Sequence, residues 1–225
     1  MMAQALRALR AGGLYFDGVS SYVNLPPIPL TKFTVTLWMN SHPYDGIVTQ
    51  RTAIARDYRD PNGYRVFWEI DCPSYGNRIR FLVSDTYTGS KFDFSYPVSL
   101  PNWYFVALAY GRNDAYAYVN GVLVQTGTAD VRTELMDTII KIGAPGAGYF
   151  KGIVDKVRIY NRTLTADEIR AIYERDALIR DGLVLLLDFS EYEGDIAYDK
   201  SGCGNHATIY GARWATRKPS RVLQG

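Results

Sequence analysis

The sequence predicts an all-β protein, an antiparallel sandwich of two packed sheets with one short helix near residues 166–176. Almost all of residues 14–160 consists of short segments of alternating apolar and polar residues, separated by glycine, proline and asparagine turn signals. The last of these segments runs directly into a helix that has its own capping signals. Hydrophobic residues make up 47% of the 225-residue chain, which is enough to build one real core.

The expected strands follow one another along the chain. Each alternates in the way that is typical of a strand with one buried face. They are 33–41, 63–71, 78–85, 91–98, 103–111, 115–127, 137–145 and 152–160, after an opening strand that begins at 14. Pro73 and Gly76 mark a hairpin loop, and Asn120-Gly121 marks a second tight turn. Pro97 favours an edge position for its strand, because proline cannot donate to a neighbouring strand.

The helix is predicted from its start and its spacing. Thr165 is expected to be the N-cap, and Glu168 stands three residues later, where it can complete a capping box. Ile169, Ile172 and Tyr173 are spaced so that one helical face presses on the layer beneath.

Composition excludes some classes of partner. The net charge of +2 gives no electrostatic case for nucleic acid. No apolar run approaches the roughly 20 residues of a membrane span. Arg7 and Arg10 interrupt the apolar residues of 1–12, so no signal peptide is visible, and this segment is expected to be an N-terminal extension. Cys72 and Cys203 allow either one disulfide or two free thiols.

Three segments together resemble a known family. They are LYFDGVSSYVNLP (14–26), WYFVALAYGRNDAYAYVNGVLV (103–124) and FKGIVDKVRIYNRTLTADEI (150–169). Over residues 13 to about 176 the chain resembles the laminin G-like, concanavalin A-type jelly rolls. The resemblance implies a jelly-roll sandwich. It says less about function, because this architecture serves lectins, glycosidases, adhesion modules and virion proteins alike.

The C-terminal segment 182–214 resembles the opening strands of that family, which normally precede the FDG strand. We therefore expect a single domain over 13–225 in circularly permuted order, with the tail completing the sandwich of its own chain. Two alternatives stay open. The tail can pair with the next copy, which gives self-association by strand exchange, or it is the stump of a second domain with an exposed apolar strand.

The resemblance also implies a structural calcium site. Asp155 is an acid on a strand face shared with Ile153 and Val157. In calcium-binding relatives an acid at this point acts with a residue near the FDG turn, which matches Asp17, while the carbonyl of Gly18 could add one of the six to eight oxygens that Ca²⁺ needs. The alternative is that Asp155 only accepts hydrogen bonds from turn amides.

Carbohydrate is the expected small ligand, because 18 tyrosines offer rings on which sugars can stack. Tyr58, Tyr75 and Tyr87 fall in predicted loops and are the candidate ligand-binding residues. The alternative is that the aromatic residues pack the sandwich, as the alternation around Trp38 and Trp68 indicates.

A catalytic function is not expected. Glu69 and Asp71 resemble the start of the E-x-D-x-x-E strand of laminarinase-type glycosidases, but Ser74 stands where the second glutamate should be. The sequence favours a non-catalytic binding or assembly module that recognises carbohydrate or protein surfaces, outside the cell or on a particle. The first alternative is a structural protein of a virion or other particle surface, and glycoside hydrolysis is a distant third.

Overall fold

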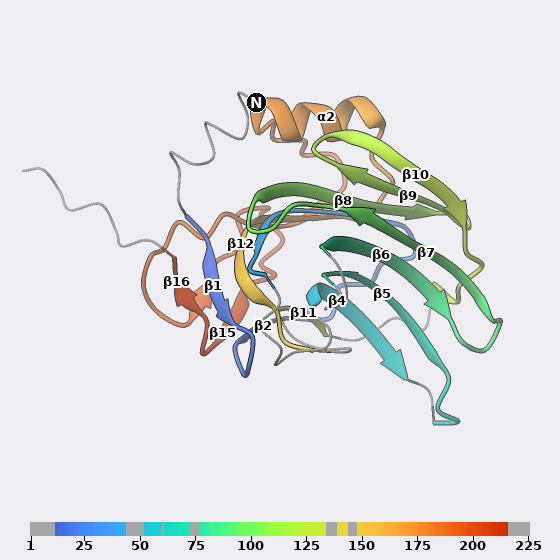
Figure 1. Cartoon of the computed structure of the whole chain (residues 1–225), viewed down its shortest axis with the longest axis horizontal. Helices are drawn as coiled ribbons and strands as arrows, with labels where there is room; N and C mark the ends of the chain where they lie inside the picture. The colour runs from blue at the N-terminus through green and yellow to red at the C-terminus, as the bar shows by residue number, and fades with distance from the viewer. Residues whose placement is uncertain are drawn as a thin grey trace, which may run out of the picture.

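The structure is a computed structural model, and it describes residues 12–43, 52–59, 61–72, 77–133, 139–143 and 148–215. Its strands form two antiparallel sheets of eight strands each, and one short helix lies among the described residues (Figure 1). The predicted all-β sandwich with a helix near 166–176 is confirmed.

The first sheet contains the middle of the chain and both described ends. Its strands are β1 (Leu14–Asp17), β3 (Phe33–Ser41), β8 (Trp103–Gly111), β9 (Asp114–Val119), β10 (Val122–Thr128), β12 (Lys151–Tyr160), β13 (Leu183–Leu187) and β16 (Arg213–Trp214). Their order is β10-β9-β8-β3-β12-β1-β16, and β13 also pairs with β12.

The second sheet carries the long hairpins of residues 52–97. Its strands are β2 (Tyr22–Leu25), β4 (Thr52–Arg59), β5 (Arg65–Asp71), β6 (Arg78–Asp85), β7 (Ser90–Pro97), β11 (Ile140–Ile142), β14 (Ile196–Ala197) and β15 (Ala207–Tyr210). Their order is β14-β15-β2-β11-β4-β5-β6-β7, so the strand that ends at Pro97 lies at an edge, as predicted.

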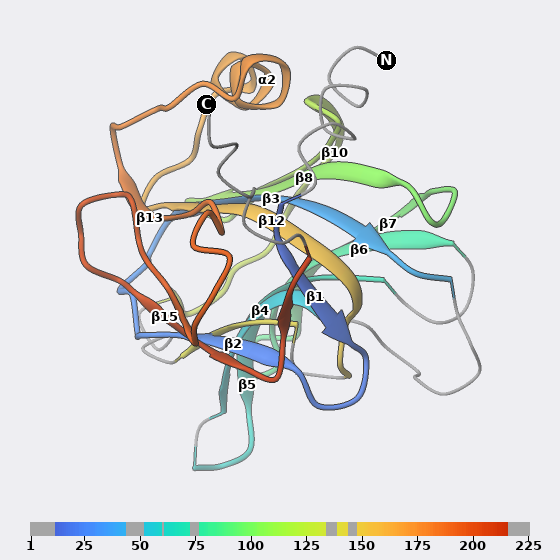
Figure 2. The same cartoon turned by 90° about the vertical axis from the view of Figure 1, so that its left-hand side faces the viewer.

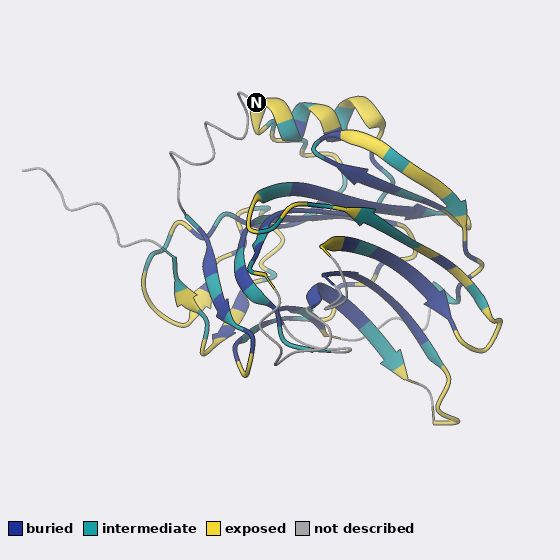
Figure 3. Cartoon of the chain, in the orientation of Figure 1, coloured by how far each residue is buried: buried dark blue, intermediate teal, exposed yellow. Residues whose placement is uncertain are grey.

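The core lies between the two sheets. Figure 3 shows most strands buried along much of their length, whereas exposed residues gather in turns, on the helix and along the edge strand β10. The rings of Phe33 and Trp68 join the two layers with centroids 5.1 Å apart. Gly143 is required beneath Phe16, because a Cβ at Gly143 would lie 2.1 Å from a carbon of the Phe16 ring.

Helix α2 (Ala166–Arg175) covers the outer face of the first sheet (Figure 2). Thr165 is its N-cap, and the predicted capping box with Glu168 is present in both directions. Ile169 and Ile172 are buried in a second apolar cluster, together with residues of β3, β8, β9 and β12. The predicted apolar helical face is thus confirmed.

The C-terminal segment supplies strands to both sheets. Strand β13 pairs with β12, β15 pairs with β2, and β16 pairs with β1, all within this chain. Strands β1 and β13 lie along the same edge of β12, since Leu14 pairs with Val154 and Leu187 pairs with Val157. Strand β13 of the tail therefore pairs with the part of the β12 edge that β1 leaves open.

Two further observations concern cysteine and membranes. Cys72 is buried, Cys203 is exposed, and no disulfide joins them. Among the described residues, no helix is long and apolar enough to cross a membrane.

Candidate functional site

The outer face of the second sheet carries a group of charged side chains. Along β5 the side chains of Trp68 and Ile70 enter the core, so alternation turns those of Glu69 and Asp71 outward. Helix α2 lies on the other sheet. Even so, Glu69 is only 4% exposed and Asp71 is fully buried. We call Glu69, Asp71, Arg80 and Asp93 the acid–arginine cluster.

One guanidinium group faces three carboxylates in this cluster. Arg80 donates two hydrogen bonds of 2.7 Å to the two carboxylate oxygens of Asp93. Its Nη1 also lies 3.8 Å from Glu69 Oε1 and 3.8 Å from Asp71 Oδ2. Because Arg80 is engaged first with Asp93, its single positive charge neutralises Glu69 and Asp71 only in part.

The pKa values of the two buried acids, Glu69 and Asp71, are raised. Burial, followed by the neighbouring charge of Glu69, raises the pKa of Asp71 to about 8. Burial also raises the pKa of Glu69. Among the described residues, no donor reaches either carboxylate oxygen of Asp71. The raised pKa therefore favours the protonated form of Asp71 at neutral pH, whereas the Arg80 guanidinium lowers the pKa of Asp93.

A second feature lies at the rim, next to the turn between β6 and β7. Tyr64 is 41% exposed and Tyr87 is 62% exposed, and their rings meet edge to face with centroids 5.1 Å apart. The guanidinium of Arg132 stacks over the Tyr87 ring at 4.4 Å from the centroid. We call Tyr64 and Tyr87 the tyrosine platform.

The platform is braced from below by a buried carboxylate. Asp85 is fully buried and accepts hydrogen bonds of 2.7 and 2.9 Å from Nε and Nη2 of Arg132. It also accepts the main-chain N–H of Tyr87 at 2.8 Å. Burial opposes ionisation, but the Arg132 and backbone hydrogen bonds outweigh it and lower the pKa of Asp85. Asp85 thus fixes the main chain of Tyr87, while Arg132 contacts its ring.

The three tyrosines named from the sequence have different positions. Tyr87 is exposed in a turn, as predicted. The expectation of a loop at Tyr58 is wrong, because this residue lies in β4, pairs with Val66 and packs against the core. Tyr75 lies outside the described residues. The sequence did not identify Tyr64 as a candidate ligand-binding residue. The only signal would have been its position opposite Tyr87 across the β5–β6 hairpin.

The structure does not bring the predicted calcium ligands together. Asp17 pairs with Lys151, whereas Asp155 lies four positions further along β12, which corresponds to roughly 13 Å. The carboxylate of Asp17 accepts the N–H groups of Val19, Ser20 and Ser21, which lowers its pKa although burial opposes this.

Asp155 likewise has a local hydrogen bond. It is 2% exposed and accepts the N–H of Lys156 at 2.7 Å. Asp17 with the Gly18 carbonyl and Asp155 therefore do not form one shared site. No group of three or more metal-ligating side chains occurs in the described part of the chain. Calcium binding itself stays a prediction.

Comparison with known proteins identifies the superfamily. A family profile described as "Concanavalin A-like lectin/glucanases superfamily" matches residues 17–170, which is more than half of the chain. No curated protein matches the sequence closely enough to be reported.

Several solved structures share the fold at low sequence identity. A proposed carbohydrate-binding protein from Bacteroides ovatus has a TM-score of 0.63 and 15% identity, covering 92% of this chain, while this chain spans only 61% of that protein. A heptameric SAP-like pentraxin from Limulus polyphemus has a TM-score of 0.60 and 12% identity, with coverage of 89% and 95%.

The third comparison is with a carbohydrate-binding module. The CBM40 of a Ruminococcus gnavus IT-sialidase, bound to α2,3 sialyllactose, has a TM-score of 0.56 and 14% identity, with coverage of 72% of this chain and 96% of that one. None of these three is a virion or particle subunit, so they do not support that alternative.

Proposed function

The chain belongs to the concanavalin A-like lectin/glucanase superfamily, and on this basis we propose that it is a non-catalytic carbohydrate-binding module. The observation that carries the proposal is the tyrosine platform, two exposed rings in edge-to-face contact, of which Tyr87 is also contacted by the Asp85–Arg132 pair. The resemblance of the fold to a proposed carbohydrate-binding protein and to a CBM40 supports the same function.

The platform suits a sugar for physical reasons. The C–H groups on one face of a pyranose ring are apolar and pack against an aromatic ring, while its hydroxyl groups remain at the edge and reach polar partners. Tyrosine combines a large apolar face with a polar tip at a low cost in side-chain entropy. The contacts of Arg132 and Asp85 with Tyr87 lower this entropy cost further, because they order Tyr87 before a ligand binds.

Glycoside hydrolysis is the second candidate, and one observation favours it. Glu69 and Asp71 are two interacting acids on one strand face, and the pKa of Asp71 is raised to about 8, as a general acid requires. Against it, a catalytic pair must touch its substrate, and neither acid is more than 4% exposed. Their burial favours a structural role, and we therefore keep binding as the proposed function.

A glycan array tests the proposal. The wild type is expected to bind a defined set of glycans, and Tyr87→Ala is expected to lose them. The matched control is Tyr198→Ala, because Tyr198 is 46% exposed and also has an aromatic neighbour and a cation over its ring, but lies in the C-terminal segment. An array without any binder, or equal loss in both variants, would refute a sugar site on the platform.

A further inference from the structure

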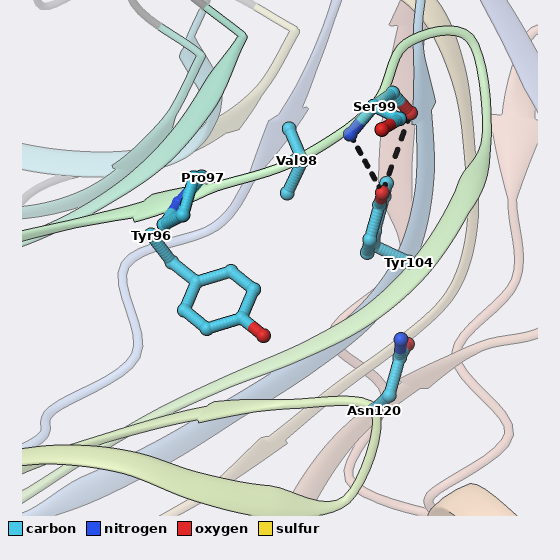
Figure 4. Close-up of a pocket in the computed structure, with 6 residues that line it drawn as sticks. All are labelled: Tyr96, Pro97, Val98, Ser99, Tyr104 and Asn120. Atoms are coloured by element: carbon cyan, nitrogen blue, oxygen red, sulfur yellow. Dashed lines mark hydrogen bonds between the residues drawn. The ribbon is translucent and has the colours of Figure 1, made fainter.

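A hollow lies at the other end of β7 from the tyrosine platform (Figure 4). It opens where β7 leaves the second sheet and the chain crosses to β8 of the first. Its volume is about 260 Å³, and it is lined by Tyr96, Pro97, Val98, Ser99, Tyr104 and Asn120. The eight residues of β7 span about 26 Å, so the hollow and the platform are separate places.

Hydrogen bonds within the walls fix the shape of the hollow. The hydroxyl of Tyr104 accepts the N–H of Ser99 at 2.9 Å and lies 3.3 Å from the Ser99 carbonyl, to which it can donate. The side-chain oxygen of Asn120 accepts the N–H of Phe105 at 3.1 Å. The connection between β7 and β8 is thus pinned to the strand that follows it, and the walls are formed before a ligand binds.

The hollow presents polar groups to a shared space. In Figure 4 the hydroxyl of Tyr96 points into the space between these residues, and the amide of Asn120 lies on the other side of it, directed toward Tyr104. Because the Asn120 oxygen faces the Phe105 N–H, its amide nitrogen remains as the donor on the open side. Pro97 and Val98 add a small apolar surface to a lining that is mostly polar, and none of the six lining residues is charged.

We propose that this hollow is a second ligand site, which binds one neutral sugar ring. The mostly polar lining, with the Tyr96 hydroxyl and the Asn120 amide donor, matches the hydroxyl groups at the edge of a neutral pyranose, and the small apolar surface of Pro97 and Val98 can contact one of its faces. An anionic ligand would find no cationic partner among the lining residues. The volume lies below the roughly 300–1,000 Å³ of typical ligand pockets, so the site takes a single ring and not a long oligosaccharide. The inference does not rest on the tyrosine platform.

The test is a titration of the full chain followed by amide NMR. The probes are the methyl glycosides of glucose, galactose, mannose and N-acetylglucosamine, each raised to about 100 mM because single rings bind weakly. At least one is expected to shift the amide signals of Ser99, Tyr104 and Asn120 in a saturable way. If no glycoside gives saturable shifts at these amides, the site is refuted.

Variants separate this site from the rest of the molecule. Tyr96→Phe removes one hydroxyl and keeps the ring, and it should weaken binding about fivefold, as expected for one lost hydrogen bond. Asn120→Asp keeps the oxygen that accepts from Phe105 but loses the donor, and it should also weaken binding. The matched control Tyr198→Phe should leave the affinity measured at the amides of Ser99, Tyr104 and Asn120 unchanged. Unchanged affinity in Tyr96→Phe and Asn120→Asp would contradict the proposal.

Discussion

Arg132 binds the carboxylate of Asp85 through two side-chain hydrogen bonds of 2.7 and 2.9 Å, and its guanidinium also stacks on Tyr87. A fully buried acid of the second sheet is thereby connected to an exposed ring. This connection links the stability of the rim to the proposed function, because the ring that would contact a sugar is ordered by a salt bridge beneath it.

We therefore expect Asp85→Asn to affect both properties. Removing one partner of a buried pair leaves the other charge uncompensated, and the free energy of unfolding should fall by about 2–3 kcal/mol in urea titrations. Glycan affinity should fall as well, since Tyr87 loses its support. Arg132→Lys keeps the charge but not the two-point geometry, and it should give a smaller loss of both. Unchanged stability in Asp85→Asn would contradict the assigned brace.

The lowered pKa of Asp85 also predicts that the stability of the fold depends on pH. Its pKa is lowered in the folded state, so it stabilises the fold above its ordinary pKa of 3.8, and this stabilisation is lost as pH falls below that value. Melting temperatures of the wild type should decrease from pH 5 to about pH 3 more than those of Asp85→Asn. If the melting temperatures of the wild type and Asp85→Asn fall equally over this range, Asp85 does not form an ion pair with Arg132 that stabilises the fold.

For Asp71 in the acid–arginine cluster, we expect the stability of the fold to change with pH in the opposite direction. The pKa of Asp71 is raised from 3.8 to about 8, so its protonated form contributes stability below pH 4 that is lost as pH rises toward 8. Asp71→Asn, which cannot ionise, should raise the free energy of unfolding by about 2–4 kcal/mol at pH 8 and by little at pH 4. The comparison variant Asp93→Asn should lower the pKa of Asp71, because it removes a neighbouring negative charge and releases Arg80 from its first partner. A stability loss in Asp71→Asn at pH 8 would contradict the raised pKa of Asp71.

The C-terminal strands lead to a test of the domain. We propose that residues 13–225 fold as one unit, closed by their own tail. Deletion of 182–225 would expose the edge of β12 from Val157 to Tyr160, and the truncated chain should unfold or aggregate. Light scattering of the full chain should report a monomer in dilute solution. A full chain that forms oligomers, and a deletion that dissociates them into folded monomers, would instead establish strand exchange.

The calcium prediction can be settled by melting curves. Asp17 and Asp155 both accept hydrogen bonds from nearby main-chain N–H groups and are separated along β12. If the site that the family resemblance implies exists, calcium should raise the melting temperature of the wild type and leave that of Asp155→Ala unchanged. Equal melting temperatures with calcium and with a chelator would refute the site.

The local features of the fold were predictable from the sequence. The capping box of Thr165 and Glu168 depends on residues three positions apart. The strand before it was also predicted, but the expected face of Ile153, Asp155 and Val157 is wrong, because a register shift between Asp155 and Arg158 interrupts the alternation and puts Val154 in the core with Val157. Strand β4 was missed for a physical reason. Arg56 is fully buried on its core-facing side and donates to the Ile28 carbonyl, so the segment lacks the apolar alternation of a typical strand.

The sites depend on pairings that a single strand does not reveal. Alternation alone put Glu69 and Asp71 on one face, but Arg80 joins them only because β6 pairs with β5 in one particular register. The tyrosine platform needs two turns to meet at the rim, and Arg132 reaches it from a third segment. Tertiary contacts of this kind have no periodic signal in the sequence.

The most direct test of the central claim is an NMR measurement of through-space contacts with a glycan that the array identifies. Carbohydrate binding at the tyrosine platform predicts contacts between the ring protons of Tyr87 and the C–H protons on one face of a sugar, and their loss in Tyr87→Ala. A bound glycan whose contacts all lie elsewhere on the protein, with none to Tyr64 or Tyr87, would contradict it.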